Sequence, residues 1–128
     1  MVNPRLVHLK KRGDFLRVAS AQRKFVTPSL ILQARPHEHT EVGDVAPLRV
    51  GITVTRRVGN AVIRNRVRRR LRAAAENILP QFLALDSDLV IIARQAALCQ
   101  DYANLTGHLK SALARYQKEK KKQNSIAE

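Results

Sequence analysis

Residues 56–72 read RRVGNAVIRNRVRRRLR, and eight of these seventeen residues are arginine, while none is aspartate or glutamate. Like charges at this density repel one another and destabilise a compact chain. A planar guanidinium group binds phosphate oxygens through two parallel hydrogen bonds, and it also stacks on bases. The segment therefore predicts contact with a polyanion in the working state.

The charge of the whole chain agrees with that prediction. Its 128 residues carry 24 lysines and arginines against 10 acidic residues, a formal net charge of +14, which draws a protein to nucleic acid or to an anionic membrane. A membrane partner is disfavoured, because the longest strongly apolar run, LVIIA at 89–93, is far shorter than the roughly 20 residues of a membrane span. The N-terminus lacks the apolar stretch of a signal peptide, and a single cysteine excludes an intrachain disulfide. We therefore expect a cytoplasmic protein.

Gly59 and Asn60 mark the start of a helix in the basic segment, with Asn60 as its N-cap. An apolar stripe at spacings of three and four residues follows and ends before Pro80; it consists of Ile63, Val67, Leu71, Ala74 and Ile78. At about 100° per residue, the opposite side of the helix is basic; it carries Asn65, Arg68, Arg69 and Arg72, flanked by Arg64 and Arg66. Arg70 falls near the edge of the apolar stripe.

A solvated helix face is the ordinary explanation of a charged run, but such a face mixes signs so that residues four apart form ion pairs. Here no acidic residue follows Arg56 until Glu76, so a nucleic-acid partner is favoured. A DNA-binding protein would usually show a helix-turn-helix, zinc or zipper framework. The chain has no cysteine–histidine set for zinc and no heptads around the basic helix, which favours RNA over DNA.

Strand patterns lie on both sides of the basic helix. Residues 48–55 alternate apolar with small or polar side chains, as in a half-buried strand, and residues 88–94 form a continuous apolar run, as in a strand covered on both faces. Residues 24–34 are also strand-like but are interrupted by Pro28, which predicts an edge strand or two short strands.

Helical spacing predicts two further helices, at 9–19 and at 102–117, the second with an apolar stripe that begins at Tyr102. The polar segment 37–47 predicts a loop. Residues 119–128 are basic and lack an apolar face, which predicts a disordered tail. The resulting order, α-β-β-(β)-α-β-α, predicts a single α/β (α+β) sandwich domain over residues 1–118 that binds RNA.

The segment RVGITVTRRVGNAVIRNRVRRRLR, residues 49–72, resembles the signature of the bacterial ribonuclease P protein subunit. That family carries a strand of the type R-V-G-x-x-V, a basic pair, and then G-x-A-V-x-R-N-R-x-[KR]-R-x-x-R, and every one of these positions matches. LKKRGDFLRV is similar to the first helix of the family and DLVIIAR to its last strand, so the resemblance covers residues 6–116.

The resemblance implies a sandwich like that of a ribosomal protein domain, with a left-handed crossover between parallel strands, against the usual handedness. It implies a subunit of an endoribonuclease, in which a catalytic RNA, with Mg²⁺, removes the 5′ leader of precursor tRNA. The protein would bind both the ribonuclease P RNA and the leader. The residues that the resemblance assigns to the RNA subunit are Arg57, Arg64, Asn65, Arg66, Arg68, Arg69 and Arg72.

A second surface, between the first helix and the sheet face, is implied to bind single-stranded leader, with aromatic side chains stacked on bases. The residues carried over to it are Phe15, Ile31, Gln33, Thr53, Thr55, Val90, Ile92 and Arg94. Family members often have aromatic residues at the positions of Ala19 and Gln33, so the leader contact here is expected to depend more on charge and hydrogen bonds. Core packing is the alternative role for Phe15.

No catalytic constellation is evident, and the chain by itself is expected to be non-catalytic, with no metal site. His37 and His39 could hold a metal ion but lie in the polar loop, and Asp86 and Asp88 could bind Mg²⁺, although Asp88 is expected to cap its strand. Two other functions stay open: an RNA-binding structural protein of another ribonucleoprotein such as the ribosome, and a nuclease that acts alone. The expected partners are the ribonuclease P RNA and precursor tRNA, with no membrane and no DNA.

Overall fold

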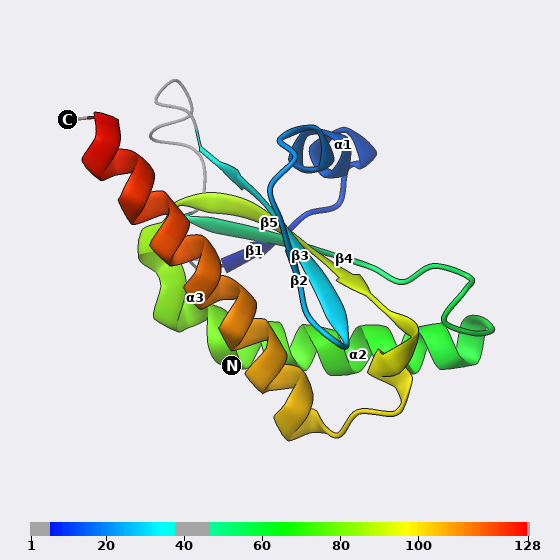
Figure 1. Ribbon diagram of the computed structural model, residues 1–128. Helices are drawn as coiled ribbons and strands as arrows, with labels where there is room; N and C mark the ends of the chain where they lie inside the picture. The colour runs from blue at the N-terminus through cyan, green and yellow to red at the C-terminus, as the bar shows by residue number, and fades with distance from the viewer. Residues whose placement is uncertain (1–5, 38–46, 128) are drawn as a thin grey trace.

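The computed structural model describes residues 6–37 and 47–127, which form a mixed five-stranded sheet with helices on both faces (Figure 1). The strands lie in the order β1-β4-β5-β3-β2. Their bounds are β1 Leu6–His8, β2 Lys24–Val26, β3 Leu30–Pro36, β4 Leu48–Thr53 and β5 Ser87–Ala93. β4 is parallel to its neighbours β1 and β5, whereas β3 is antiparallel to β5 and β2.

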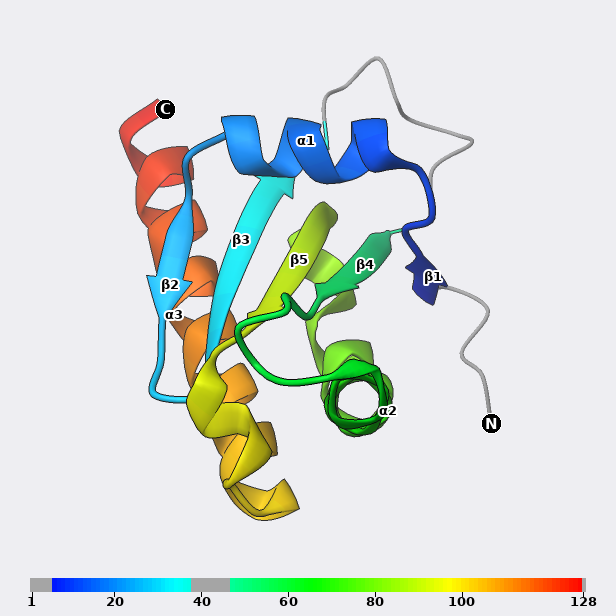
Figure 2. The same cartoon turned by 90° about the vertical axis from the view of Figure 1, so that its right-hand side faces the viewer.

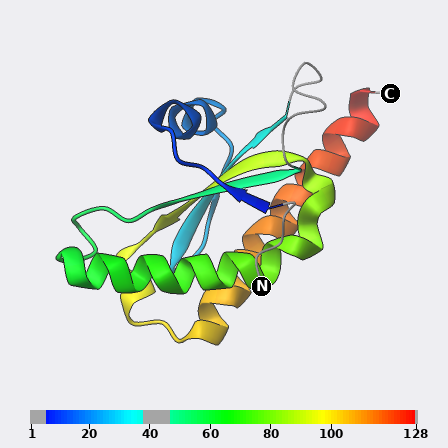
Figure 3. The same ribbon diagram turned by 180° about the vertical axis from the view of Figure 1, so that it is seen from behind.

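The helices are α1 Arg12–Ser20, α2 Ala61–Ile78 and α3 Tyr102–Ala127, with the 3₁₀ segments η2 Leu79–Leu85 and η3 Gln95–Leu98. Helices α2 and α3 cover one face of the sheet, and α1 lies on the other (Figure 2). The main core fills the space between the sheet and the α2–α3 pair, and a smaller cluster under α1 contains Leu9, Val18 and Val90. Seen from behind, α2 passes beneath the strands (Figure 3).

Strand β5 is buried on both faces because its side chains alternate between these two clusters. Leu89, Ile91 and Ala93 belong to the main core, whereas Val90 and Ile92 pack on the α1 side. The prediction of a strand covered on both faces is therefore confirmed.

The strand pieces on either side of Pro28 are β2 and β3, which pair antiparallel. Thr27 closes the turn between them, because its hydroxyl donates to the Leu30 carbonyl at 2.7 Å and its backbone N–H donates to the same oxygen at 2.9 Å. The prediction of two short strands is confirmed.

Strand β1 was not predicted. Three residues are too few to show a period of two, and β1 exists only because it pairs with β4. The α-helical part of α2 ends at Ile78, as predicted from Pro80, but helical structure continues as η2. Proline fits the first turn of that 3₁₀ segment, where its missing N–H is not needed.

Helix α3 continues to Ala127, whereas the sequence predicted a disordered tail from residue 119. The Lys120 ammonium group donates to the Leu85 carbonyl and lies 3.5 Å from the Ser87 hydroxyl, so it ties the extended helix to the sheet. Lysine, glutamate and glutamine are also good helix formers. The contact of Lys120 and the helix propensity of the tail both favour helix past the end of the apolar stripe.

The parallel neighbours β4 and β5 are joined through α2 and η2, so the crossover that the resemblance implied is present. Its handedness stays an implication of the resemblance. The predicted loop at 37–47 lies largely outside the described residues. Within the described parts of the chain, no helix is long and apolar enough to cross a membrane.

Candidate nucleic-acid interface

The basic helix α2 begins at the cap that the sequence predicted. The side-chain oxygen of Asn60 accepts a hydrogen bond from the backbone N–H of Ile63 at 3.0 Å. The preceding loop is anchored by Val54 and Val58, which are buried in the main core. A Cβ atom on Gly59 would lie 2.7 Å from Cγ2 of Ile63, so this close entry into the helix needs glycine. Local sequence thus determines where the arginines start along the helix.

The arginine face of α2 consists of Arg64, Asn65, Arg66, Arg68, Arg69 and Arg72. Val67 and Leu71 are buried beneath it, as the apolar stripe predicted. Asn65, Arg66, Arg69 and Arg72 are exposed, and Arg64 and Arg68 are half-buried. A groove of about 420 Å³ runs along this face and is lined by Val62, Asn65, Arg68, Arg69 and Arg72.

No cation of the arginine face has a carboxylate partner within residues 6–37 and 47–127. Within the face, Nη1 of Arg68 donates to Oδ1 of Asn65 at 3.0 Å. Unpaired guanidinium groups repel one another but keep their donors available for phosphate.

Arg70 differs from its neighbours because its guanidinium group is engaged inside the protein. Its Nη1 donates to the carbonyl of Ala97 at 3.3 Å, and its Nη2 donates to the carbonyl of Gln100. These bonds tie α2 to the segment that leads from η3 into α3. The predicted position of Arg70 at the core edge is confirmed.

Strand register brings the predicted leader-binding residues of the sheet to one face, the face away from α2 and α3. Ile31 pairs with Ile92 and Gln33 with Val90 across β3 and β5, and Thr53 pairs with Ile92 across β4 and β5. Side chains at paired positions point to the same side of a sheet. Residues from three separate segments therefore form one continuous surface.

Phe15 reaches this surface from α1. Its ring lies against the backbone of β4 at Gly51, where an added Cβ atom would be 2.4 Å from Cε1 of the ring. Phe15 is half-buried and packs against the small cluster that contains Val18 and Val90. Val90 is only 2% exposed, so it supports the surface from below rather than offering contact area. Phe15 thus has the packing role that the sequence left open, although the residue is only half-buried.

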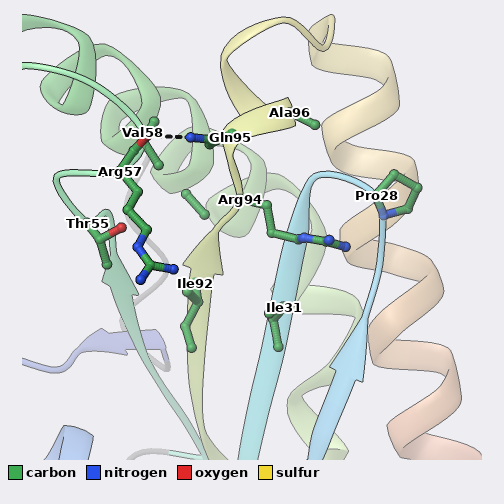
Figure 4. A pocket seen from close by; sticks show the side chains of 10 residues that line it. Pro28, Ile31, Thr55, Arg57, Val58, Ile92, Arg94, Gln95 and Ala96 are labelled. Atoms are coloured by element: carbon green, nitrogen blue, oxygen red, sulfur yellow. Dashed lines mark hydrogen bonds between the residues drawn. The ribbon is translucent and has the colours of Figure 1, made fainter.

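A cavity of about 670 Å³ opens beyond the C-terminal ends of β4 and β5 (Figure 4). Four predicted leader-binding residues line it: Ile31, Thr55, Ile92 and Arg94. Arg57, which the resemblance assigned to the RNA subunit, also lines it, and its side chain extends towards Ile92 in Figure 4. Nη1 of Arg94 donates to the Thr27 carbonyl at 2.8 Å, and Nε2 of Gln95 donates to the Arg57 carbonyl at 2.9 Å. The cavity therefore combines isoleucine side chains with two guanidinium groups; the predicted residues outside it are Phe15, Gln33, Thr53 and Val90.

The opposite end of the same sheet face carries a charge network that the sequence did not predict. Asp88 is 1% exposed and accepts hydrogen bonds from Nε and Nη2 of Arg49 at 2.8 and 2.6 Å, and from Nε2 of His37 at 2.7 Å. Nη1 of Arg35 lies 3.7 Å from the same carboxylate. The expectation that Asp88 caps its strand is wrong, because Asp88 lies inside β5 and neutralises side chains of the neighbouring strands. Those partners are far away in sequence, so no local pattern could reveal them.

The network shifts both of its central pKa values. Burial alone would raise the pKa of Asp88, but hydrogen bonds from His37 and Arg49 lower it to about 2. Burial alone would lower the pKa of His37, but its hydrogen bonds with Asp88 and Asp86 raise it overall. Both ring nitrogens of His37 are thereby engaged, at 2.7 and 3.0 Å, which leaves none for a metal ion.

His39, the other half of that candidate metal site, lies outside the described residues. In the parts of the chain that the structure describes, no group of three or more His, Cys, Asp or Glu side chains could hold a metal ion.

The chain matches a known protein family over nearly its whole length. The sequence model of the family Ribonuclease P matches residues 4–117. The ribonuclease P protein component of Paramagnetospirillum magneticum is 48% identical over 111 residues, which cover 87% of this chain and 83% of that protein. The ribonuclease P protein component of Gluconacetobacter diazotrophicus is 44% identical over 105 residues, which cover 82% of this chain and 86% of that protein.

Solved structures share the fold. The RNase P protein of Staphylococcus aureus aligns with a TM-score of 0.70 at 26% identity, covering 85% of this chain and 94% of that one. The RNase P protein from Thermotoga maritima aligns with a TM-score of 0.69 at 23% identity, covering 84% and 96%. The predicted α/β sandwich is thereby confirmed. With its mixed sheet, its basic helix and its matching sequence, this chain belongs to the ribonuclease P protein family and is a component of the endoribonuclease that processes tRNA 5′ ends together with an RNA subunit.

Proposed function

We propose that this chain is a protein cofactor that binds the ribonuclease P RNA on the arginine face and the 5′ leader of precursor tRNA along the sheet face under α1. The observation that carries the proposal is the arginine face, whose cations have no carboxylate partner among the described residues. Family membership favours this role over a structural protein of another ribonucleoprotein and over a nuclease that acts alone.

The arginine face suits an RNA backbone for two reasons. Each exposed guanidinium group of Arg66, Arg69 and Arg72 can donate two parallel hydrogen bonds to one phosphate. Each phosphate that is neutralised also releases condensed counterions, which favours binding most strongly at low salt. Arg64, Asn65 and Arg68 border the same surface and complete the proposed contact with the RNA subunit.

The sheet face suits a single strand rather than a duplex. At the cavity, Ile31 and Ile92 offer an apolar surface for a base, while Arg57 and Arg94 offer donors for phosphates. The surface continues through Thr53 and Gln33 towards Phe15, whose ring can stack on a base. The resemblance gave Arg57 to the RNA subunit; we assign it instead to the leader in this proposal, which is supported by its position in the lining of the cavity and not of the groove on α2.

The chemistry is assigned to the RNA subunit, with Mg²⁺ bound mainly by that RNA and by the substrate. The carboxylates beside the sheet face do not fit as Mg²⁺ ligands. Asp88 is engaged by Arg49 and His37, and Asp14 accepts a hydrogen bond from Arg17 at 2.5 Å. Precursor tRNA is the proposed substrate, and this chain positions it.

Reconstitution tests the proposal. The purified chain, a ribonuclease P RNA and a precursor tRNA are mixed at low Mg²⁺, where a cationic cofactor should matter most. We expect removal of the 5′ leader only when protein and RNA are both present. Cleavage by RNA-free protein that survives repurification would contradict the assignment of the chemistry. A protein that leaves cleavage by the RNA unchanged would contradict the cofactor role.

A further inference from the structure

Tyr102 has a different environment from the other members of the apolar stripe of α3. Leu105 and Leu109 are fully buried, whereas Tyr102 is 41% exposed. The chain has five aromatic residues, all within the described ranges. Three of them are buried and Phe15 is half-buried. Tyr102 is thus the one exposed residue among the five aromatic residues, and its position suggests a reason.

Tyr102 lies beside the arginine face. A shallow groove of about 250 Å³ is lined by Arg66, Arg69, Arg70, Ala73 and Tyr102. Arg69 also lines the groove along α2, so the two grooves share one arginine. The small side chain of Ala73 adds little bulk to the groove beside the ring.

The segment before Tyr102 is held in place by hydrogen bonds. Arg70 donates to the carbonyls of Ala97 and Gln100, which fixes this segment against α2. Asp101 then caps α3, because its Oδ1 accepts from the backbone N–H of Asn104 at 2.8 Å. A ring carried on such a fixed turn loses little conformational entropy when it binds a partner.

We infer that this groove is a base-stacking site, in which an unpaired base of the RNA subunit lies on the Tyr102 ring and the adjacent phosphates bind Arg66 and Arg69. The inference rests on the proposed function of the arginine face. Bases in a duplex are already stacked, whereas unpaired RNA bases are recognised by aromatic rings next to cations. Three arginines and no carboxylate line the groove. Its positive charge therefore attracts RNA more strongly than a protein surface that is poor in acidic residues.

The test compares Tyr102→Ala, Tyr102→Leu and Tyr102→Phe in the full chain by affinity for the ribonuclease P RNA over a range of salt concentrations. We expect a loss of about 5- to 150-fold for the alanine and leucine variants, as for one stacked base. The phenylalanine variant should bind almost like the wild type. The slope of log affinity against log salt should not change, because no charge is removed. Chemical probing should show one RNA nucleotide that is protected by the wild type and by Tyr102→Phe but not by Tyr102→Ala.

Matched variants keep the test decisive. Val26→Ala removes another exposed apolar side chain, on β2, and should leave RNA affinity unchanged. Leucine preserves bulk and helix propensity, so wild-type binding by Tyr102→Leu would overturn the stacking site. If Arg69→Ala weakens binding and lowers the salt slope while all Tyr102 variants bind normally, the stacking site is wrong and the arginine face stands. If Arg69→Ala also has no effect, the proposed function of the face fails as well.

Discussion

Arginine side chains have opposite roles in two regions of this protein. On the arginine face they are exposed or half-buried and have no carboxylate partner among the described residues. On the sheet face, Arg49 forms two hydrogen bonds with the buried carboxylate of Asp88. The same chemical group is therefore available for binding where it is left unpaired, and it stabilises the fold where a buried carboxylate neutralises it.

Burial explains the difference. A charge removed from water needs a counter-charge and hydrogen bonds, and the loss of one partner leaves the other uncompensated. An exposed arginine is solvated and needs no partner, so a cluster of them costs only mutual repulsion. The network should therefore determine stability, and the arginine face should determine RNA affinity. The two properties should be separable by mutation.

The largest effect is expected for Asp88→Ala, which leaves Arg49 and His37 without their shared partner. We expect the free energy of unfolding to fall by about 3–5 kcal/mol, as when one member of a buried ion pair is removed. Urea unfolding followed by circular dichroism measures it. Glu76→Ala is the control, because Glu76 is 39% exposed and lies 3.6 Å from His8, and an exposed pair contributes roughly 0–1 kcal/mol. Equal losses in the two variants would contradict a structural role for the network.

The pH dependence of the same variant sharpens that result. The pKa of Asp88 is about 2 in the folded protein, below its ordinary value of 3.8. Its stabilising contribution is therefore complete above pH 3.8 and is lost as the pH falls towards 2. The free energy of unfolding of Asp88→Ala, measured in urea at several acidic pH values, should not show this decrease.

The double variant Arg69→Ala with Arg72→Ala should have the reverse phenotype. We expect affinity for the ribonuclease P RNA to fall by roughly 2–3 kcal/mol, from the loss of charged hydrogen bonds to phosphate. The slope of log affinity against log salt should decrease by somewhat under two units. Stability should be unchanged or slightly higher, because repulsion is relieved. An unchanged salt slope would mean that these side chains only face solvent.

The double variant Phe15→Leu with Arg94→Ala, on the sheet face under α1, should distinguish leader binding from binding of the RNA subunit. Leucine keeps apolar contact with Gly51 but removes the ring, and we expect a loss of roughly 1–3 kcal/mol for a stacked base, towards the lower value because Ala19 and Gln33 supply no second ring. The loss should appear only for precursor tRNA that carries a 5′ leader. Affinity of the assembled complex for substrates with and without the leader measures it. Equal losses for both substrates would show that this surface does not bind the leader.

The smallest effect is expected for His37→Gln. The pKa of His37 is raised in the folded protein, so the stability that its charged form contributes is complete below pH 6.5 and is lost as the pH rises through the folded value. The free energy of unfolding of the wild type should therefore decrease as the pH rises above 6.5, and that of the variant should decrease less. Urea unfolding at several pH values tests this, and identical pH profiles would exclude a charged His37 in the network.

The sequence by itself determined the features that lie within one element. The cap at Asn60, the apolar stripe beneath α2 and the direction of the arginine face follow from helical periodicity and local hydrogen bonding, both of which act over a few residues. The continuous run in β5 and the break at Pro28 were predictable for the same reason. The family motif at 49–72 also lies in one stretch, so it could be read without the fold.

Only the tertiary structure decided what depends on contacts between distant segments. Strand order brought Asp88 between Arg35 and Arg49, and the ends of β4 and β5 placed Arg57 and Arg94 in the lining of one cavity. The packing of α3 on α2 put Tyr102 next to Arg69 instead of in the core. In each case the partners are separated by tens of residues, and nothing in a local period of 2 or 3.6 specifies which distant side chains will meet.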